Sequence, residues 1–292
     1  MIKVCLSGLG KTGKEIAGVL LEQKDIQLVS VICSPNSGKK GKELGEILGC
    51  RDTGIYVESS DNLRQVIFQK KPDVVIDFSN AAAAVRNAKI FAKMKVNMVI
   101  GTTGFSGMDL KRLYILTRKY HNGIVYAPNI TLGVNVLMLL TNLASGILNN
   151  YDFQITEVHH KYKKDAPSGT AKKIAAEIEK GMAASGMDST SVNIPIHAVR
   201  AGGVVGRHEV LIVGEEDEIL ISHESFSRKA FAQGAIRTVK FICGKSGYFE
   251  MSDVLNLQRI LRNLMEKDEH RNGSSMRQPA QESKIESGVC AL

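Results

Sequence analysis

The sequence predicts an α/β protein with a doubly wound parallel sheet, followed by a second, α+β region with a mixed sheet. Over the first 130 residues, short apolar runs alternate with segments of helical periodicity, which is typical of parallel strands covered by helices on both faces. A glycine-rich turn joins the first such run to the first helical segment. Later in the chain, three strand-like runs follow one another with short turns, which favours hairpin-like, antiparallel or mixed pairing.

The predicted elements of the first part alternate strictly between strand and helix. Strands are expected at residues 2–8, 26–33, 73–79, 96–103 and 123–129. Helices are expected at residues 11–22, 61–70, 80–94 and 108–120. The strands are apolar on both faces, so we expect them to be buried between two layers of helices.

The second part begins with an uncharged stretch, 130–148, which is long enough to raise the question of a membrane span. It carries Thr131, Asn135, Thr141, Asn142 and Ser145, so we predict a buried amphipathic helix at 134–149 instead. Further helices are expected at 170–182 and 229–243, and strands at 153–160, 194–202, 207–214 and 218–225. Residues 266–292 are polar and lack aromatic residues, which predicts a disordered tail.

Composition excludes several classes of function. The net charge of +8 favours anionic partners, but the lysines and arginines are scattered and no basic tract has aromatic neighbours, so no nucleic-acid binding is expected. The five cysteines lie far apart without a CxxC pair, which argues against a zinc cage or disulfides and fits a reducing compartment. The first residues lack the features of a signal peptide. We therefore expect a cytoplasmic protein.

The turn GLGKTG, residues 8–13, has the G-x-G-x-x-G spacing of a Rossmann-like dinucleotide site. Gly8 permits the tight turn, Gly10 lets the backbone approach a pyrophosphate, and Gly13 lets helix and strand pack closely. The strand at 26–33 ends without the acid that usually binds the ribose of NAD. Its absence favours NADPH over NADH, as do three nearby lysines, although these could simply face solvent: Lys39, Lys40 and Lys42.

Two further segments end predicted strands at the edge where open α/β sheets bind ligands. They are IGTTGF, residues 100–105, and YAPNI, residues 126–130. Gly101, Thr102 and Thr103 would offer backbone and hydroxyl groups to the nicotinamide half of the cofactor. Ordinary turn chemistry is the alternative for both segments.

The stretch EVHHKYKKDAPSGTA, residues 157–171, masses imidazoles and ammonium groups before a helix start. His159 and His160 end a strand and point to opposite faces, so one could exchange protons and the other bind a ligand. Lys163 offers a positive charge or a proton. Ser168 or Thr170 would cap the helix, and the N–H groups at Gly169 and Thr170 would bind a carboxylate. A solvated basic loop is the alternative, and no metal is expected because adjacent histidines on a strand chelate poorly.

The same stretch resembles the signature of the dihydrodipicolinate reductase (4-hydroxy-tetrahydrodipicolinate reductase) family of diaminopimelate and lysine biosynthesis. Other segments resemble that family in the same order from about residue 1 to residue 262, among them VVIDFS, VIGTTGF, APNITLGVN, RAGGVVGRHEV, ISHESFSRKAFAQGA and GYFEMSDVL. The resemblance implies that, after loss of water, a cyclic C=C conjugated with an imine is reduced to tetrahydrodipicolinate, with hydride from NADPH or NADH. It also implies a small dicarboxylate substrate and a homotetramer formed through the second sheet.

The resemblance assigns roles residue by residue. His159 would be a proton donor and acceptor, Lys163 a proton donor, and His160, Gly169 and Thr170 would bind the substrate. The cofactor would contact three segments, namely Gly8, Leu9, Gly10, Lys11, Thr12 and Gly13; Gly101, Thr102 and Thr103; and Ala127, Pro128, Asn129 and Ile130. Arg228 matches a family position without an assigned step.

The resemblance also implies a division of the chain. Residues 1–130 and 241–265 would bind the dinucleotide, with a C-terminal helix returning to the first sheet, and residues 131–240 would bind substrate and form the oligomer. Two departures stand out, the missing acid of the second strand and a short segment at 182–196 that lacks the G-x-T-G-x-R stretch of the substrate lid. The alternatives are an NAD(P)-dependent amino-acid or diamino-acid dehydrogenase and a catalytically silent NADPH-binding sensor.

Overall fold

The computed structural model describes residues 1–186, 193–257, 259–260 and 262–263. The chain divides into two compact units, residues 1–254 and residues 255–292. In the second unit the N–H of Ile260 donates to the carbonyl oxygen of Asn256 at 3.1 Å, as in a helical turn. The predicted tail at 266–292 lies outside the described residues, as do residues 187–192 of the segment predicted to be short.

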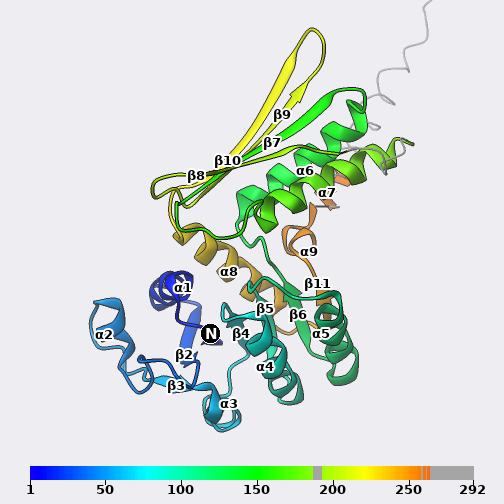
Figure 1. The fold of residues 1–292 in the computed structure, drawn as a ribbon. Helices are drawn as coiled ribbons and strands as arrows, with labels where there is room; N and C mark the ends of the chain where they lie inside the picture. Colours follow the sequence, from blue (N-terminus) through cyan, green and yellow to red (C-terminus); the bar gives the residue numbers. More distant parts are fainter. Residues whose placement is uncertain (187–192, 258, 261, 264–292) are drawn as a thin grey trace, which may run out of the picture. The chain divides into compact units, whose positions relative to one another are not determined.

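The first sheet has seven strands, all parallel, as predicted (Figure 1). Its order is β11-β6-β5-β4-β1-β2-β3. The strands are β1 (Ile2–Ser7), β2 (Ile26–Cys33), β3 (Val57–Ser59), β4 (Val74–Asp77), β5 (Asn97–Ile100), β6 (Gly123–Tyr126) and β11 (Gly247–Phe249). Chain order reverses between β1 and β4, and such a switch point opens a ligand crevice beyond the carboxyl ends of the strands.

Helices cover both faces of this sheet (Figure 1). On one face α1 (Lys11–Leu21) packs against α8 (Lys229–Ile242). On the other lie α3 (Leu63–Lys70), α4 (Ala81–Lys93) and α5 (Gly107–Tyr120). The core beneath the second group includes Cys5, Phe91 and Met98, each at most 1% exposed. The doubly wound arrangement predicted from the apolar strands is therefore confirmed.

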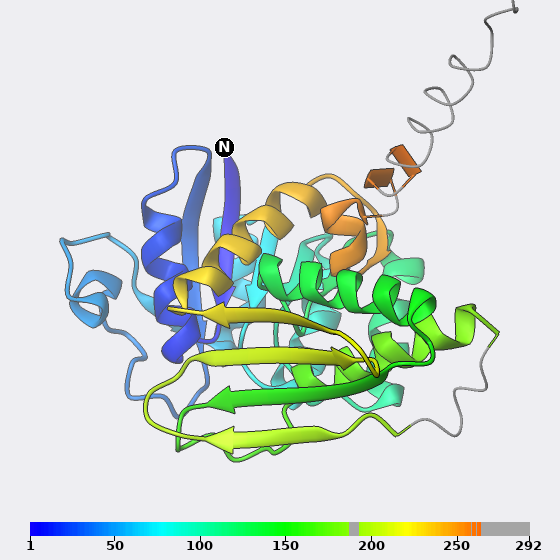
Figure 2. The same ribbon diagram turned by 90° about the horizontal axis from the view of Figure 1, so that it is seen from above.

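The second sheet has four strands and is mixed, which is also as predicted (Figure 2). The strands are β7 (Asp152–His159), β8 (Ile196–Arg200), β9 (Gly206–Val213) and β10 (Glu218–Ser225), in the order β10-β9-β7-β8. Its inner face packs on α6 (Leu132–Ile147) and α7 (Gly169–Ala184) around a core that includes Phe153, Ile174 and Val210.

The predicted succession of three hairpin-like strands is only partly right. β9 and β10 form an antiparallel hairpin. β8 does not pair with β9: it pairs in parallel with β7, on the edge of β7 that faces away from β9. An alternating sequence shows that a segment is a strand and does not show which neighbour it pairs with. The region expected as a returning helix, 241–265, instead contains strand β11 before the short α9 (Met251–Leu255). The short α2 (Leu44–Leu48), β3 and a 3₁₀ turn at Ser60–Asn62 were not predicted.

The apolar helix α6 is explained by its packing on α7. Asn142 Nδ2 donates to the carbonyl oxygen of Glu177 at 2.8 Å, and Ser145 Oγ donates to that of Ile178 at 2.9 Å. Two of the polar residues noted in the sequence, Asn142 and Ser145, therefore hold the two helices together. Among the helices that the structure describes, none combines the length and apolarity needed to cross a bilayer.

Candidate active site

The glycine turn lies at the carboxyl end of β1, and two of its positions require glycine. Gly8 has a φ of 97°, and a Cβ there would lie 2.5 Å from the carbonyl oxygen of Phe78. A Cβ on Gly13 would lie 2.0 Å from the carbonyl oxygen of Gly8, so α1 could not approach β1 this closely. Gly10 is the N-cap of α1 and supplies no capping side chain. The first N–H groups of α1 therefore remain available to an anion.

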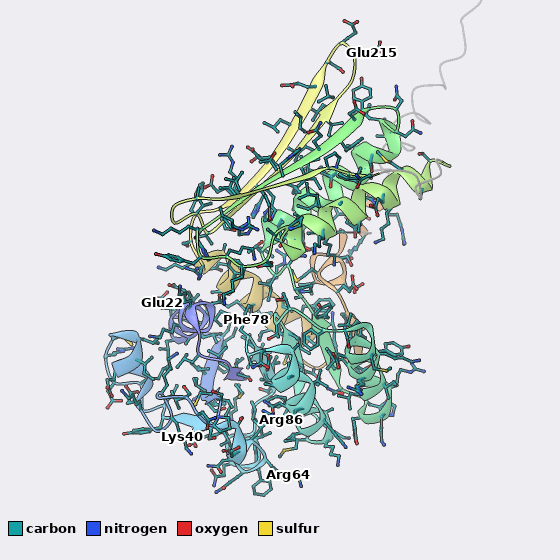
Figure 3. The ribbon with its side chains drawn as sticks, in the orientation of Figure 1. Glu22, Lys40, Arg64, Phe78, Arg86 and Glu215 are labelled. Carbon is teal, nitrogen blue, oxygen red and sulfur yellow. The ribbon has the colours of Figure 1, made fainter. Side chains whose placement is uncertain are left out.

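A hollow beside this turn is lined by Ser34, Ser37 and Lys39 as well as by residues 8–10. Lys39 Nζ donates a hydrogen bond to the carbonyl oxygen of Leu9. Lys40, in contrast, is exposed at the surface (Figure 3). Of the lysines considered in the sequence, Lys39 is thus held directly at the turn. Larger hollows of about 800 Å³ and 630 Å³ lie elsewhere and are lined by neither the glycine turn nor a histidine.

The residues that follow β5 and β6 border the same edge of the sheet. Thr102 is buried, and its hydroxyl donates to Asp77 Oδ1 at 2.7 Å, whereas Thr103 is exposed. Beyond β6, Ala127, Asn129 and Ile130 are buried and Pro128 is half-buried. The hydroxyl of Thr102 is therefore committed to a structural hydrogen bond, and that of Thr103 is open to a ligand.

The two adjacent histidines have different surroundings, but they do not share a strand. β7 ends at His159, which is 8% exposed on the inner face. His160 lies in the following turn, where its carbonyl oxygen accepts from the N–H of Lys163 at 3.0 Å. The prediction of opposite faces on one regular strand was therefore wrong, because the strand stops one residue earlier. Because His160 lies beyond the strand, the alternation of side chains along β7 does not set its orientation.

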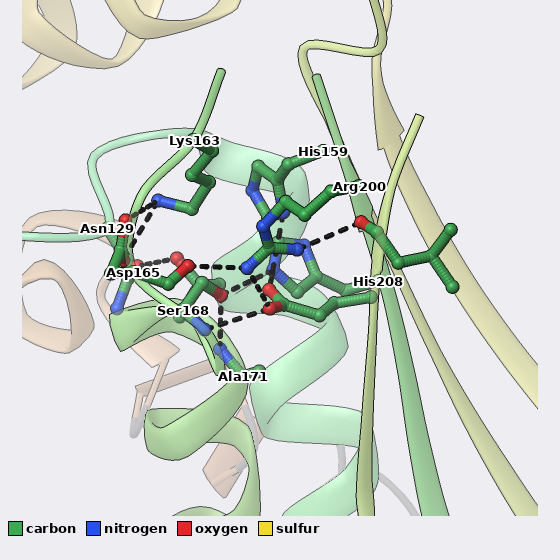
Figure 4. A network of polar contacts seen from close by, with 11 residues as sticks. Asn129, His159, Lys163, Asp165, Ser168, Ala171, Arg200 and His208 are labelled. Carbon is green, nitrogen blue, oxygen red and sulfur yellow. Dashed lines mark hydrogen bonds and ion pairs between the residues drawn. The ribbon is translucent and has the colours of Figure 1, made fainter. Parts of the chain in front are cut away.

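The loop from 160 to 168 leads into the N-terminus of α7 (Figure 4). Ser168 is the N-cap, and its hydroxyl accepts from the N–H of Ala171 at 3.1 Å. Gly169 is exposed, and a Cβ there would meet nothing within 4 Å. Thr170 Oγ1 donates to Asn129 Oδ1 at 2.6 Å. This hydrogen bond joins the predicted substrate receptor to the residues that follow β6.

Lys163 reaches an acid that follows it in the same loop (Figure 4). Its Nζ lies 2.8 Å and 2.9 Å from the two carboxylate oxygens of Asp165. Arg200, at the end of β8, donates to the carbonyl oxygen of Asp165 and so holds the loop against the sheet. Lys163, His159 and the start of α7 therefore surround one region of the second sheet.

Three functional candidates beneath this region were missed in the sequence, namely Glu157, Arg200 and His208. Glu157 is fully buried, with Arg200 Nη2 2.8 Å from its Oε1 and His159 Nδ1 3.2 Å from its Oε2. His208 Nε2 lies 3.7 Å from the same Oε2. The only sequence signal for Glu157 is that it stands two positions before His159, on the same face of the strand. Arg200 lies on β8 and His208 on β9, and pairing of these strands with β7 places both residues beside Glu157.

Burial dominates the protonation of this cluster. It lowers the pKa of His159 to about 4, against the attraction of Glu157, which raises it. Burial likewise lowers the pKa of His208 to about 4, with repulsion from His159 as a second cause. For Glu157, burial alone would raise the pKa, but hydrogen bonds from Ser168 and Arg200 outweigh it and lower the pKa. The cluster therefore contains an anionic carboxylate between two neutral imidazoles at neutral pH.

Among the described residues, Glu157, His159 and His208 are the one group of three whose donor atoms lie close enough to hold a metal, all within 4.8 Å of one another. The charge of the carboxylate is already balanced by the guanidinium of Arg200. We therefore interpret the group as a polar cluster balanced by Arg200 and not as a metal site.

Two family models together match nearly the whole described chain. The one described as "Dihydrodipicolinate reductase, N-terminus" matches residues 2–130, and "Dihydrodipicolinate reductase, C-terminus" matches residues 133–255. The 4-hydroxy-tetrahydrodipicolinate reductase of Methanocaldococcus jannaschii is 38% identical over 275 residues, covering 89% of this chain and 99% of that protein.

Solved structures agree with this relationship. A dipicolinate-bound dihydrodipicolinate reductase from Paenisporosarcina sp. TG-14 superposes with a TM-score of 0.70 at 28% identity, covering 86% of this chain and 97% of that one. An amine dehydrogenase from Mycobacterium smegmatis has a TM-score of 0.62 at 17% identity, covering 85% and 94%, and is similar in fold alone. This second likeness therefore shows a shared fold and nothing further. The chain belongs to the dihydrodipicolinate reductase family.

Proposed function

We propose that the chain reduces 4-hydroxy-tetrahydrodipicolinate to tetrahydrodipicolinate with a reduced nicotinamide cofactor. One observation carries the proposal, the hydrogen bond of 2.6 Å between Thr170 and Asn129. It joins the open start of α7, next to His159 and Lys163, to the end of β6, whose sheet also carries the glycine turn. A cofactor lying along that edge of the sheet and a substrate at α7 would therefore be neighbours.

Each protein group has a task that follows from its chemistry. The N–H groups of Gly169 and Thr170 bind one substrate carboxylate at a helix N-terminus. Lys163 and His160 bind the other end of the dianion. Loss of water from the 4-hydroxy substrate gives a ring C=C conjugated with the imine. The cofactor, when bound, supplies hydride to this ring. His159 or Lys163 then gives a proton to the enamine carbon, which completes addition of two hydrogens across the C=C.

The test is oxidation of NADPH by the purified protein with the freshly made condensation product of pyruvate and aspartate semialdehyde. His159→Gln and Lys163→Ala should each lower kcat on the order of 100-fold or more, since both remove a proton donor. Lys164→Ala is the matched control, because Lys164 is exposed in the same loop. Wild-type rates in both site variants would refute the assignment, and an inactive wild-type protein would refute the proposed reaction.

The second sheet supports the proposal of a homotetramer. Its outer face, opposite α6 and α7, pairs Leu220 with Leu211, and Leu220 and Val199 are 57% and 42% exposed. Exposed apolar side chains on such a face, which also carries Arg207 and Glu209, favour an interface. The division of the chain into a cofactor part, 1–130 with 241–265, and a substrate part, 131–240, remains part of the proposal, as does a cytoplasmic location.

A further inference from the structure

Glu157 is fully buried, and only one of its two carboxylate oxygens accepts hydrogen bonds. The side chain is 0% exposed, and Oε1 accepts both the N–H of Ser168 at 2.9 Å and Nη2 of Arg200 at 2.8 Å. Oε2 is equally buried but accepts no such hydrogen bond. A buried carboxylate oxygen without a donor is costly, so the groups that face Oε2 should be able to supply one.

Two imidazole nitrogens face Oε2. His159 Nδ1 lies 3.2 Å away and is likewise buried without a hydrogen-bond partner, whereas His208 Nε2 lies 3.7 Å away. His208 Nε2 also lies 3.4 Å from the hydroxyl of Ser168. The closest complementary pair is therefore the Nδ1–H of His159 with Oε2 of Glu157.

We propose that Glu157 is a positioning residue for proton transfer, whose Oε2 accepts the Nδ1–H of His159 and so leaves Nε2 as the atom that exchanges protons with substrate. The proposal deepens the proposed function and rests on it for the identity of the substrate. Arg200 and the N–H of Ser168 hold Oε1, and therefore fix the carboxylate whose other oxygen orients the imidazole. His159 fixed in this way presents a lone pair when neutral and a proton when charged, always from the same nitrogen.

The opposite side of the imidazole is kept clear by Gly206. This residue begins β9, and a Cβ built on it would lie 3.1 Å from His159 Nε2. Its φ is not in the left-handed region, so the backbone does not require glycine there. The side chain of His159 is 11% exposed, and none of that exposure is on Nδ1. The exposed part of the imidazole therefore excludes Nδ1, as the proposal requires.

The charge of Glu157 also affects the pKa of His159. The charged or titratable groups that face His159 from its own strand, from β8, from β9 and from the loop are Glu157, Arg200, His208, Lys163 and Asp165. Burial, Lys163 and Arg200 lower the pKa of His159, whereas Glu157 and Asp165 raise it. Removal of the charge on Glu157 would therefore lower this pKa further and make His159 a poorer base.

The first experiment needs no variant. Long-range ¹H–¹⁵N NMR of the wild-type protein labelled at histidine nitrogens, with His159 assigned by loss of its signals in His159→Gln, should show the Nδ1–H tautomer at neutral pH. The Nε2–H tautomer would overturn the proposal. This readout does not depend on substrate, so it remains decisive even if the proposed reaction fails.

The second experiment uses Glu157→Gln, which keeps the shape and removes the charge. A donor NH₂ facing Nδ1 should shift His159 to the Nε2–H tautomer and lower kcat on the order of 100-fold with little change in KM. Donation requires a protonated His159, so the alkaline limb of the kcat profile should move to lower pH. Glu157→Asp retains the charge, and its limb should stay close to that of the wild type.

Two outcomes would contradict a positioning role. An unchanged tautomer and an unchanged alkaline limb in Glu157→Gln would show that Glu157 acts only in folding, whatever happens to kcat. Loss of wild-type activity after treatment with EDTA, restored by a divalent ion, would show that Glu157, His159 and His208 serve a metal instead.

Discussion

At the scale of single residues, the sequence points to the proposed catalytic pair but not to the residues that surround it. His159 and Lys163 stand in one continuous stretch, where imidazole and ammonium precede a helix start. Glu157 stands in the same stretch, but its importance depends on Arg200 and His208, 43 and 51 positions further on. The register that places His208 opposite Glu157 is a property of the folded sheet. No local pattern in the sequence contains it.

Lys39 leads to a prediction about cofactor choice. It lines the hollow beside the glycine turn, at the end of a strand that lacks the usual acid. An ammonium group at that place attracts the 2′-phosphate of NADPH, so Lys39→Glu should lower kcat/KM for NADPH at least tenfold, roughly one lost charge-assisted hydrogen bond. The efficiency with NADH should be retained or should rise, since an acid there binds the ribose hydroxyls.

The matched control is Lys40→Glu, because Lys40 is exposed and does not line the hollow. Steady-state kinetics with both cofactors measures the ratio. Equal effects of the two substitutions would mean that general surface charge attracts the cofactor and that Lys39 has no particular part in the choice.

At the scale of elements, the hydrophobic pattern predicts where most strands and helices lie, but it does not predict which strands pair with one another. The segments predicted at 26–33 and 218–225 match β2 and β10 residue for residue. β8 was placed beside β9 because the two follow one another in sequence, yet β8 pairs with β7. Sheet neighbours are chosen by packing of whole faces, which a strand of five residues does not encode. The short β11, only three residues long, is similarly fixed by its partner β6.

Two helical glycines, one at the contact of α6 with α7 and one in α1, should respond in opposite ways to substitution by alanine. A Cβ on Gly181 would lie 2.0 Å from Ser145 Oγ and 2.1 Å from the carbonyl oxygen of Asn142. Gly181→Ala must therefore push the helices apart, and should lower the free energy of unfolding by about 2 kcal/mol. Gly18, within α1, has nothing within 4 Å of its Cβ. Gly18→Ala should raise the free energy of unfolding by roughly 0.5–1 kcal/mol.

Urea unfolding followed by circular dichroism compares the two variants under identical conditions. Destabilisation by both substitutions would show that loss of glycine itself is harmful in these helices. A neutral Gly181→Ala would show that α6 and α7 can separate without cost.

At the scale of the whole molecule, the buried histidines predict a loss of stability in acid. His159 and His208 have pKa values of about 4 in the folded chain, against about 6.5 for an unperturbed histidine. Between these values the unfolded chain binds more protons, so the free energy of unfolding must fall as pH falls through that window. The lowered pKa of Glu157 acts in the same direction at lower pH.

Urea midpoints measured between pH 7.5 and pH 4.5 should therefore decline, and His208→Gln should make the decline shallower by removing one of the two groups. The slope against pH is the relevant quantity, because the substitution changes the absolute midpoint as well. A slope that does not differ between wild type and variant would mean that His208 is charged in the folded protein.

The relation between the two sheets follows from a contact that sequence periodicity does not reveal. The chain leaves the first sheet after β6 through Ile130 and comes back along α8, and a Cβ on Gly234 of α8 would lie 1.9 Å from the carbonyl oxygen of Ile130. The outgoing and returning passages of the chain therefore lie in close backbone contact at Gly234. Any side chain larger than that of glycine at position 234 would force these two passages apart, so Gly234→Ala should disturb the contact between the segment after β6 and α8.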